Sequence, residues 1–362
     1  MINVTQTFLP PQDEYQTILK KAWDAVWLTN RGQLVKELEI KLQNYLSSAP
    51  LLATTNGTLP LQIALKVLAK QGEVITTPFS YVATTSSIVW ENSTPVFVDI
   101  DPEHLTIDET KIEAAITSKT TAILATHVFG NPCAVEEIEQ IAKKHQLAVI
   151  YDAAHGFGVN YHGKSLFDYG DVSTCSFHAT KLFHTGEGGA MFSKDEQLFQ
   201  RLYSYHNFGH DGPEKFEGLG INAKMSELQA AMGLAVLPYM EEIIIKRQVV
   251  VNTYDDQLKF RDFRKLKIRE GTEWNYSYYP IIFEEENDLL KVKEALLEEG
   301  INPRRYFYPS LHQLPYVTQV DVPISESISK RILCLPLSAS LEESIVRKIV
   351  KTINQVNRKK SI

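Results

Sequence analysis

The sequence predicts an α/β protein with a mostly parallel central sheet, followed by a smaller α+β unit. Over the first two-thirds of the 362 residues, short β-rich runs alternate with helical patterns. The runs are almost continuous in apolar residues, which is typical of parallel strands that are covered on both faces. After about residue 225 the alternation stops, and long helical patterns surround one extended run.

The expected strands of the first part are short runs of apolar or β-branched residues. They cover residues 51–54, 74–76, 95–99, 122–125, 148–151 and 172–177. Helical spacing predicts helices over 59–68 and 136–144, and in the second of these Ile138 and Ile141 share one face. A further segment between strands ends at Trp90. Strands that alternate with helices in this way predict βαβ units.

The second part begins with a long helical pattern that runs from residue 225 toward 254. An extended run over 276–283 follows, then an amphipathic helix over 288–297 that Gly300 ends, and a closing helix over 342–356. The chain has no internal repeat and no Gly/Ser-rich linker. We therefore expect two domains, residues 1–240 and 241–362, that pack closely through the long helix.

The charge balance argues against nucleic-acid binding. Lys plus Arg number 37 and Asp plus Glu 44, which gives a formal net charge of -7. The dense basic runs are Arg304-Arg305 and residues 358–360, and a solvated tail explains the second run. A nucleic-acid-binding protein needs a basic face, which this pattern does not predict.

Targeting and redox features point to the cytoplasm. Cys133, Cys175 and Cys334 are scattered and odd in number, so they predict neither a disulfide framework nor a zinc site. Residues 1–6 lack the basic and apolar regions of a signal peptide. No run approaches the roughly 18 uncharged apolar residues of a membrane span. We expect a cytoplasmic protein without a membrane partner.

Polar residues that follow the predicted strands are the first candidates for a site, because open α/β sheets bind ligands beyond the carboxyl ends of their strands. Asn56-Gly57-Thr58 follows the first strand and opens a helix. A glycine allows close backbone approach, and N–H groups at a helix N-terminus suit a phosphate. A turn with a helix cap explains the same residues equally well. The Gly-Lys-Ser/Thr end of a P-loop is missing, and no G-x-G-x-x-G occurs.

Asp152 ends the strand over 148–151 and begins Asp152-Ala153-Ala154-His155. A carboxylate after four apolar strand residues is costly unless a cation or several donors meet it. A helix cap is the simpler explanation for Asp152, and a satisfied polar histidine is the simpler one for His155. Asp152, His155, His178 and His184 match no metal-ligand spacing, so no metal is predicted.

Lys181 follows the run over 172–177 and closes the element Ser176-Phe177-His178-Ala179-Thr180-Lys181. Burial lowers the pKa of a lysine by penalising its charged form, which suits covalent chemistry with a carbonyl. A lone loop lysine is more often solvated. A phosphate cradle, a later strand-end Asp and a Ser-x-x-x-x-Lys element nevertheless occur in one order. Pyridoxal phosphate (PLP) requires that set: an anchor, a partner for its pyridinium nitrogen and a lysine.

With these elements the chain resembles the DegT/DnrJ/EryC1/StrS family of sugar aminotransferases over nearly its whole length. Each block that carries the resemblance is weak evidence alone, but their shared order is strong. In chain order the blocks are Trp27-Leu28-Thr29, Asn56-Gly57-Thr58, the run over 77–84, Gly130-Asn131-Pro132, Asp152-Ala153-Ala154-His155, the element over 176–181, Gly186-Glu187-Gly188-Gly189, the run over 222–227, and Tyr308-Pro309-Ser310-Leu311-His312. The resemblance implies PLP fold type I, the aspartate-aminotransferase type, with a large PLP-binding domain and a small C-terminal domain.

The resemblance also implies roles for individual residues. Lys181 is expected to hold PLP and shuttle a proton, and Asp152 to pair with the pyridine nitrogen. Tyr81 is expected to stack on the ring, with His155 near its phenolic oxygen.

The implied phosphate contacts are Gly57, Thr58 and Ser176, with Asn222 reaching across a homodimer that shares its active sites. Tyr308 and His312 fall in the family's substrate segment.

The implied reaction is PLP-dependent transamination of a nucleotide-linked keto-deoxysugar with L-glutamate as amino donor. The expected conversion is that of dTDP-4-keto-6-deoxyglucose to dTDP-4-amino-4,6-dideoxyglucose, and the alternative is 3-amination of a dTDP-3-keto-6-deoxyhexose. Related dehydratases carry His at the position of Lys181, so transamination is favoured. Many relatives carry Arg where this chain has Lys224, which leaves the inter-subunit contact open. A non-catalytic regulator or sugar-nucleotide sensor is a different class, and it needs neither Lys181 nor Asp152.

Overall fold

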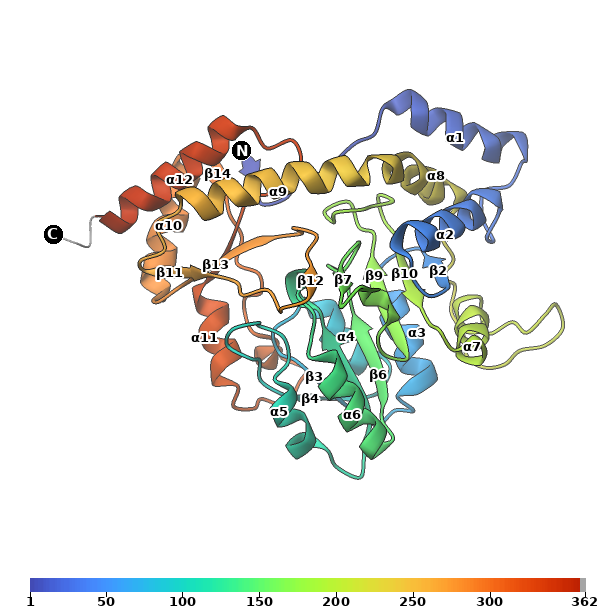
Figure 1. Cartoon of the computed structure of the whole chain (residues 1–362). Coiled ribbons are helices and arrows are strands. Elements are labelled where there is room, and N and C mark those ends of the chain that lie inside the picture. Colours follow the sequence, from blue (N-terminus) through green and yellow to red (C-terminus); the bar gives the residue numbers. More distant parts are fainter. Residues whose placement is uncertain (359–362) are drawn as a thin grey trace.

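A seven-stranded sheet forms the centre of the molecule (Figure 1). The computed structural model describes residues 1–358, so Lys359 and Lys360 of the basic tail lie outside the described residues. The strand order is β2-β10-β9-β6-β5-β3-β4. The strand bounds are β2 (Leu51–Thr54), β3 (Glu73–Thr76), β4 (Thr94–Phe97), β5 (Thr120–Thr126), β6 (Ala148–Asp152), β9 (Val172–Ser176) and β10 (Gly189–Phe192).

The sheet is mostly parallel, which confirms the predicted fold class. β3 pairs in parallel with β4 and β5, and β6 pairs in parallel with β5 and β9. β10 is the exception, since it runs antiparallel to both β2 and β9. A loop rather than a crossover helix joins β9 to β10, and only an antiparallel pair can be closed by such a connection.

Helices cover both faces of the sheet, and successive strand residues point to opposite faces. Leu52, Val74 and Ile150 belong to a core cluster that faces α3 (Leu59–Leu68) and α7 (Glu196–His206). Their strand neighbours face the other way, toward α6 (Val135–His145) or toward α2 (Gln33–Leu46) and α8 (Glu227–Val236). The remaining elements of this part are α1 (Gln12–Asp24), α4 (Val82–Trp90), α5 (Glu109–Ile112), β7 (Asn160–Tyr161) and β8 (Lys164–Ser165).

The C-terminal part contains a second, three-stranded antiparallel sheet in the order β11-β13-β15. Two helices, α10 and α12, pack against each other beside this sheet, and α12 also contacts α9. The bounds are α9 (Met240–Gln257), β11 (Phe263–Lys265), β12 (Thr272–Glu273), β13 (Tyr279–Phe283), α10 (Glu286–Glu298), β14 (Ile301–Asn302), α11 (Pro323–Arg331), β15 (Ile332–Leu335) and α12 (Glu343–Arg358).

The start of the chain also lies in this region. The first strand, β1 (Ile2–Asn3), pairs in parallel with β14, so the N-terminal residues lie beside the C-terminal part (Figure 1). The division into residues 1–240 and 241–362 stays a prediction.

One helical stretch, Glu227–Gln257, is long and apolar enough to cross a membrane by length and composition alone. It comprises α8, a short 3-10 turn over 237–239 and α9. Its first part packs against α1 and α2, and its second against α12. Within the part of the chain that the structure describes, 44% of its most apolar window is buried inside the molecule.

Arg247 ties α9 to the C-terminal sheet. The side chain is buried, and its guanidinium donates to three backbone carbonyls: Tyr276 O at 2.8 Å, Leu337 O at 3.0 Å and Ser277 O at 2.5 Å. Burial lowers the pKa of Arg247 to about 10. The three hydrogen bonds offset the cost of burying the guanidinium charge. They also satisfy three carbonyl groups that would be costly to leave unpaired in the interior.

We predict that Arg247→Met destabilises the protein by about 2–4 kcal/mol, because three buried carbonyls lose their donors. Chemical denaturation monitored by circular dichroism measures the change. The matched control is Arg347→Met on α12, where the exposed Arg347 pairs with Glu343 and with no other acidic group among the described residues, and the expected change is within about 0.5 kcal/mol. Equal, small effects of both substitutions would contradict the structural role of Arg247.

Candidate active site

The strand order brings the candidate residues to one edge of the large sheet. β2, β6 and β9 run in the same direction, so their carboxyl ends meet at that edge. Gly189 begins β10 and pairs with Thr54 on one side and with Ser176 on the other. A Cβ at Gly189 would lie 2.5 Å from the Asn56 carbonyl oxygen, so only glycine fits this crossing. The residues after β2 are thereby held beside the end of β9.

The cradle expected for a phosphate is formed where Gly57 meets Ser176. A Cβ at Gly57 would lie 2.7 Å from the Ser176 Cβ and 2.9 Å from its Oγ. The side chain of Asn56 caps α3, since its Oδ1 accepts from the N–H groups of Thr58 and Leu59 at 2.9 Å. The helix-cap explanation therefore holds for Asn56. The Thr58 and Ser176 hydroxyls take no part in this cap, and the Ser176 Oγ accepts a long hydrogen bond from the His178 N–H at 3.4 Å.

Asp152 ends β6 with its carboxylate almost completely buried. Its Oδ2 accepts a 2.6 Å hydrogen bond from the Thr84 hydroxyl, and its Oδ1 accepts from the Ala154 N–H at 3.1 Å. Burial raises the pKa of Asp152, and these two donors together with the charge of Lys181 oppose that rise. The carboxylate thus has the donors and the cation that the sequence argument required.

Lys181 lies in the loop that joins β9 to β10, and its side chain is only partly exposed. Burial lowers the pKa of Lys181, while the negative charge of Asp152 opposes this effect. A lowered pKa increases the neutral, nucleophilic fraction of an amine. The loop is held from outside by the N-terminal segment, because Thr7 donates to Ala179 O at 2.8 Å and His184 donates to Phe8 O at 2.6 Å.

His155 is buried beside Lys181 in a cluster of aromatic rings. Its Nδ1 accepts a 3.1 Å hydrogen bond from the Phe129 N–H, so the proton of the neutral ring is on Nε2. Burial and the nearby charge of Lys181 hold the pKa of His155 well below its usual value. The ring lies 4.7 Å from Tyr278 and is parallel to Phe307 at 6.1 Å. His155 is therefore a neutral Nε2–H donor.

The C-terminal candidates lie beside the loop that carries Tyr81. Tyr81 precedes α4 and is 56% exposed. His312 is buried, and its Nδ1 bonds the Ser310 hydroxyl at 3.0 Å. Leu311 N–H donates to Pro78 O at 2.8 Å, which ties this segment to the Tyr81 loop. Tyr308 stands apart from these contacts.

The ring of Tyr308 is exposed, and the Arg305 guanidinium lies over it at 3.7 Å. Asn222 is also exposed, in the loop between α7 and α8, where it pairs with Asn207. Among the described residues, Asn222 forms no hydrogen bond with the Gly57 cradle. Tyr308 and Asn222 are thus both exposed in a single chain, unlike the buried candidates Asp152, His155 and His312.

Sequence reasoning did not identify Thr84 and Gln229 as parts of this region. Gln229 holds the start of α8 to two site loops, since its Nε2 donates to Thr55 O at 2.9 Å and to Glu187 O at 2.7 Å. It also forms a capping box with Ser226, a pattern that is readable from Ser226-Glu227-Leu228-Gln229. Thr84 gives no such signal, because its contact with Asp152 depends on how α4 docks on β6.

The arrangement fits PLP. A side chain larger than glycine at position 57 would fill the cradle, and the Ser176 hydroxyl lies against it. At the same edge of the sheet, the charge of Lys181 opposes the rise that burial causes in the pKa of the Asp152 carboxyl, and the charge of Asp152 opposes the fall that burial causes in the pKa of the Lys181 amine. A metal fits less well, since no group of three His, Cys, Asp or Glu side chains within residues 1–358 is arranged to hold an ion.

Comparisons with known proteins agree with this geometry. The DegT/DnrJ/EryC1/StrS aminotransferase family matches residues 11–354. Two proteins named dTDP-4-amino-4,6-dideoxy-D-glucose transaminase, from Shigella dysenteriae and Escherichia coli, are each 40% identical to the chain. The first alignment covers 98% of this chain and 99% of the relative, and the second covers 97% and 98%. The crystal structure of DesI in the presence of its TDP-sugar product superposes with a TM-score of 0.94 at 31% identity, covering 99% of this chain and 94% of that chain. The chain therefore belongs to the DegT/DnrJ/EryC1/StrS aminotransferase family and is a PLP-dependent aminotransferase, as the ordered sequence blocks predicted.

Proposed function

We propose that the protein converts dTDP-4-keto-6-deoxyglucose to dTDP-4-amino-4,6-dideoxyglucose with L-glutamate as the amino donor. The observation that carries the transamination is the placement of the buried Asp152 and the partly buried Lys181 after β6 and β9, at the carboxyl edge of the sheet. The choice of sugar rests on the two transaminases of that name, which are 40% identical over nearly their whole lengths. A cytoplasmic location is part of the proposal and is supported by three free, buried cysteines.

In this proposal each residue of the site has one task. PLP supplies an electron sink when it is bound. Lys181 would hold it covalently, and its lowered pKa favours the neutral amine that can accept and return a proton. Asp152 would keep the pyridine nitrogen protonated. His155 would offer its Nε2–H to the phenolic oxygen, and Tyr81 would stack on the ring.

The phosphate and the sugar nucleotide are bound by residues around this centre. Gly57, Thr58 and Ser176 take the phosphate in the cradle between α3 and the end of β9. Tyr308 and His312 contact the substrate from the segment that is tied to the Tyr81 loop.

The first test is Lys181→Ala. The purified protein should be yellow from PLP bound to Lys181, and the substitution should remove the visible band, the borohydride-fixable cofactor and all turnover. A suitable control is Lys224→Ala, which also has a lowered lysine pKa but lies in the α7–α8 loop and should keep the borohydride-fixable cofactor. Absorbance and release of 2-oxoglutarate measure both. A fully active Lys181→Ala variant would refute the assignment, and PLP bound without any 2-oxoglutarate release in the wild type would indicate a sensor instead.

We also propose that the active unit is a homodimer with shared sites. The chain after α7 extends away from the sheet (Figure 1) and exposes large apolar side chains: Phe208, Phe216, Leu219 and Ile221. Several large exposed apolar side chains on one loop are typical of an interaction site. The same loop carries Asn222, which faces outward and is available to the partner's cradle.

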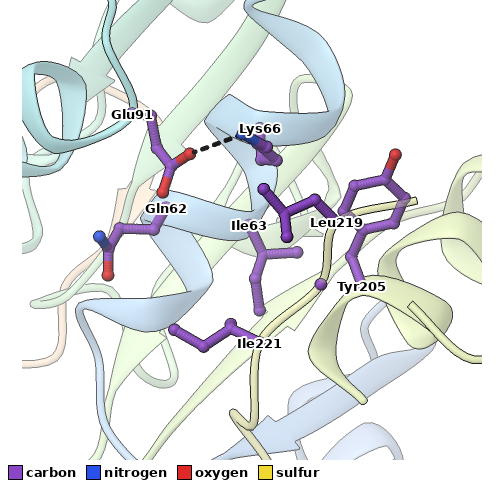
Figure 2. Close-up of a pocket in the computed structure, with 8 residues that line it drawn as sticks. Gln62, Ile63, Lys66, Glu91, Tyr205, Leu219 and Ile221 are labelled. Carbon is purple, nitrogen blue, oxygen red and sulfur yellow. Dashed lines mark ion pairs between the residues drawn. The ribbon is translucent and has the colours of Figure 1, made fainter. Parts of the chain in front are cut away.

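A cavity of about 240 Å³ continues this apolar surface (Figure 2). Leu219 and Ile221 of the loop face Ile63 of α3 across it, and the ion pair of Lys66 and Glu91 closes one side at 3.7 Å. An apolar floor with a charged rim is typical of a protein interface. A second copy of the chain is the occupant that would also complete the site.

Mixing two inactive variants tests the shared sites. A heterodimer of Lys181→Ala and Asn222→Asp should regain about half of the native sites' activity, because one of its two sites receives both native residues. The control mixture is Lys181→Ala with Asp152→Asn, which should stay inactive since each site keeps one defect from its own chain. Subunit exchange is verified by native mass spectrometry. Recovery in neither mixture, despite exchange, would show that the sites are self-contained.

Regiochemistry is a separate test, because Lys181 and Asp152 serve a C4 and a C3 ketone alike. A mismatched sugar hydroxyl leaves buried polar groups unpaired, so discrimination between positional isomers can be large. We predict that kcat/KM for dTDP-4-keto-6-deoxyglucose exceeds that for the 3-keto isomer by at least about 100-fold. Mass spectrometry and NMR of the product identify the aminated carbon. A preference for the 3-keto sugar would overturn the C4 proposal and leave the aminotransferase assignment intact.

A further inference from the structure

Three buried hydroxyls form a line that ends at Asp152. Thr126 donates to the Ser80 hydroxyl at 3.1 Å, Ser80 lies 2.7 Å from the Thr84 hydroxyl, and Thr84 donates to Asp152 Oδ2 at 2.6 Å. All three hydroxyl side chains are at most 4% exposed. They come from the end of β5, the loop before α4 and the first turn of α4.

The chemistry of the groups fixes the direction of every hydrogen bond in the line. An ionised carboxylate only accepts hydrogen bonds, so Thr84 must give its single proton to Asp152. Ser80 must then donate to Thr84, and Thr126 must donate to Ser80. Each donation polarises the next hydroxyl and strengthens the bond at the carboxylate. A protonated Asp152 could still accept from Thr84, but more weakly, because a neutral carboxyl oxygen is a poorer acceptor than a carboxylate oxygen.

We propose that Thr84, Ser80 and Thr126 are positioning residues that keep Asp152 ionised and aimed at the pyridine nitrogen of the cofactor. The inference rests on the role of Asp152 in the proposed function. Ala154 N–H holds the other carboxylate oxygen, so both oxygens are anchored and the plane of the carboxylate is fixed.

The hydroxyls act against a large cost of burial. The titratable groups that face Asp152 are Lys181, whose charge favours the ionised form, and the thiols of Cys175 and Cys133. Burial raises the pKa of both thiols, so they remain neutral and supply no charge. Loss of the Thr84 hydroxyl would therefore raise the pKa of Asp152 further. A neutral Asp152 no longer keeps the pyridine nitrogen protonated.

The test compares Thr84→Val, which removes the hydroxyl and keeps the shape, with Thr84→Ser, which restores it. The matched control is Thr85→Val, because the Thr85 hydroxyl is equally buried and has no hydrogen-bond partner among the described residues. Three readouts are taken on each holoenzyme: the dissociation constant of PLP, the pH titration of its visible absorbance, and the rate of the half-reaction with glutamate. Asp152→Asn is measured alongside.

We expect Thr84→Val to slow the half-reaction by about 10- to 100-fold and to weaken PLP binding, since hydrogen bonds to charged groups are the stronger ones. The absorbance titration should shift in the same direction as in Asp152→Asn. Thr84→Ser should recover most of the rate. Thr126 is separated from Asp152 by the hydroxyls of Ser80 and Thr84, so Thr126→Val should slow the half-reaction less than Thr84→Val does. Thr85→Val should resemble the wild type.

Three results would overturn the inference, and they have different meanings. If Asp152→Asn changes the titration and Thr84→Val does not, the hydroxyl line is irrelevant while the proposed function stands. If Asp152→Asn itself leaves the titration and the half-reaction unchanged, the role of Asp152 is wrong and the inference falls with it. Equal losses in Thr84→Ser and Thr84→Val would also refute it, because they would show a packing effect rather than a hydroxyl effect.

Discussion

The antiparallel strand β10 lies between β2 and β9, and the organisation of the site depends on this one pairing. Gly189 pairs with Thr54 of β2 and with Ser176 of β9. The turn after β2 and the loop after β9 therefore lie on the two sides of β10, separated by that one strand. Gly57 can then approach Ser176 closely, and the β9–β10 loop presents Lys181 at the same edge. Loss of that pairing would separate the phosphate cradle from the lysine. The glycines at positions 57 and 189 are accordingly steric requirements of the crossing.

Desolvation at this edge has opposite effects on the two central ionisable groups. It raises the pKa of Asp152 and lowers that of Lys181, and each charge counteracts the effect on the other. The hydroxyl of Thr84 and the N–H of Ala154 add neutral donors to the carboxylate. The donors to Asp152 favour its ionised form, and burial of Lys181 favours its neutral amine. This balance suits proton transfer at a bound cofactor.

The sequence predicted most of the sheet because its parallel strands are nearly uninterrupted apolar runs. It also predicted which residues follow the strands, so Gly57, Asp152 and Lys181 were recognised as candidates. The antiparallel direction of β10 could not be predicted from the sequence, because a short apolar run after a Gly-rich loop does not indicate which strands it pairs with. The extended run over 276–283 becomes a strand only from Tyr279, because Tyr276 adopts a left-handed backbone conformation with φ of 54°. Thr84 escaped notice for a related reason: its role arises from docking of α4, which no local pattern encodes.

The most direct test of the account is peptide mapping of the holoenzyme after borohydride reduction, with and without prior incubation with glutamate. We predict that reduction fixes the cofactor on the peptide that contains Lys181, and that excess glutamate without a sugar acceptor abolishes this label while 2-oxoglutarate appears in amounts equal to the active sites. A label on another lysine, such as Lys224, would contradict the account. So would a label on Lys181 that glutamate leaves unchanged.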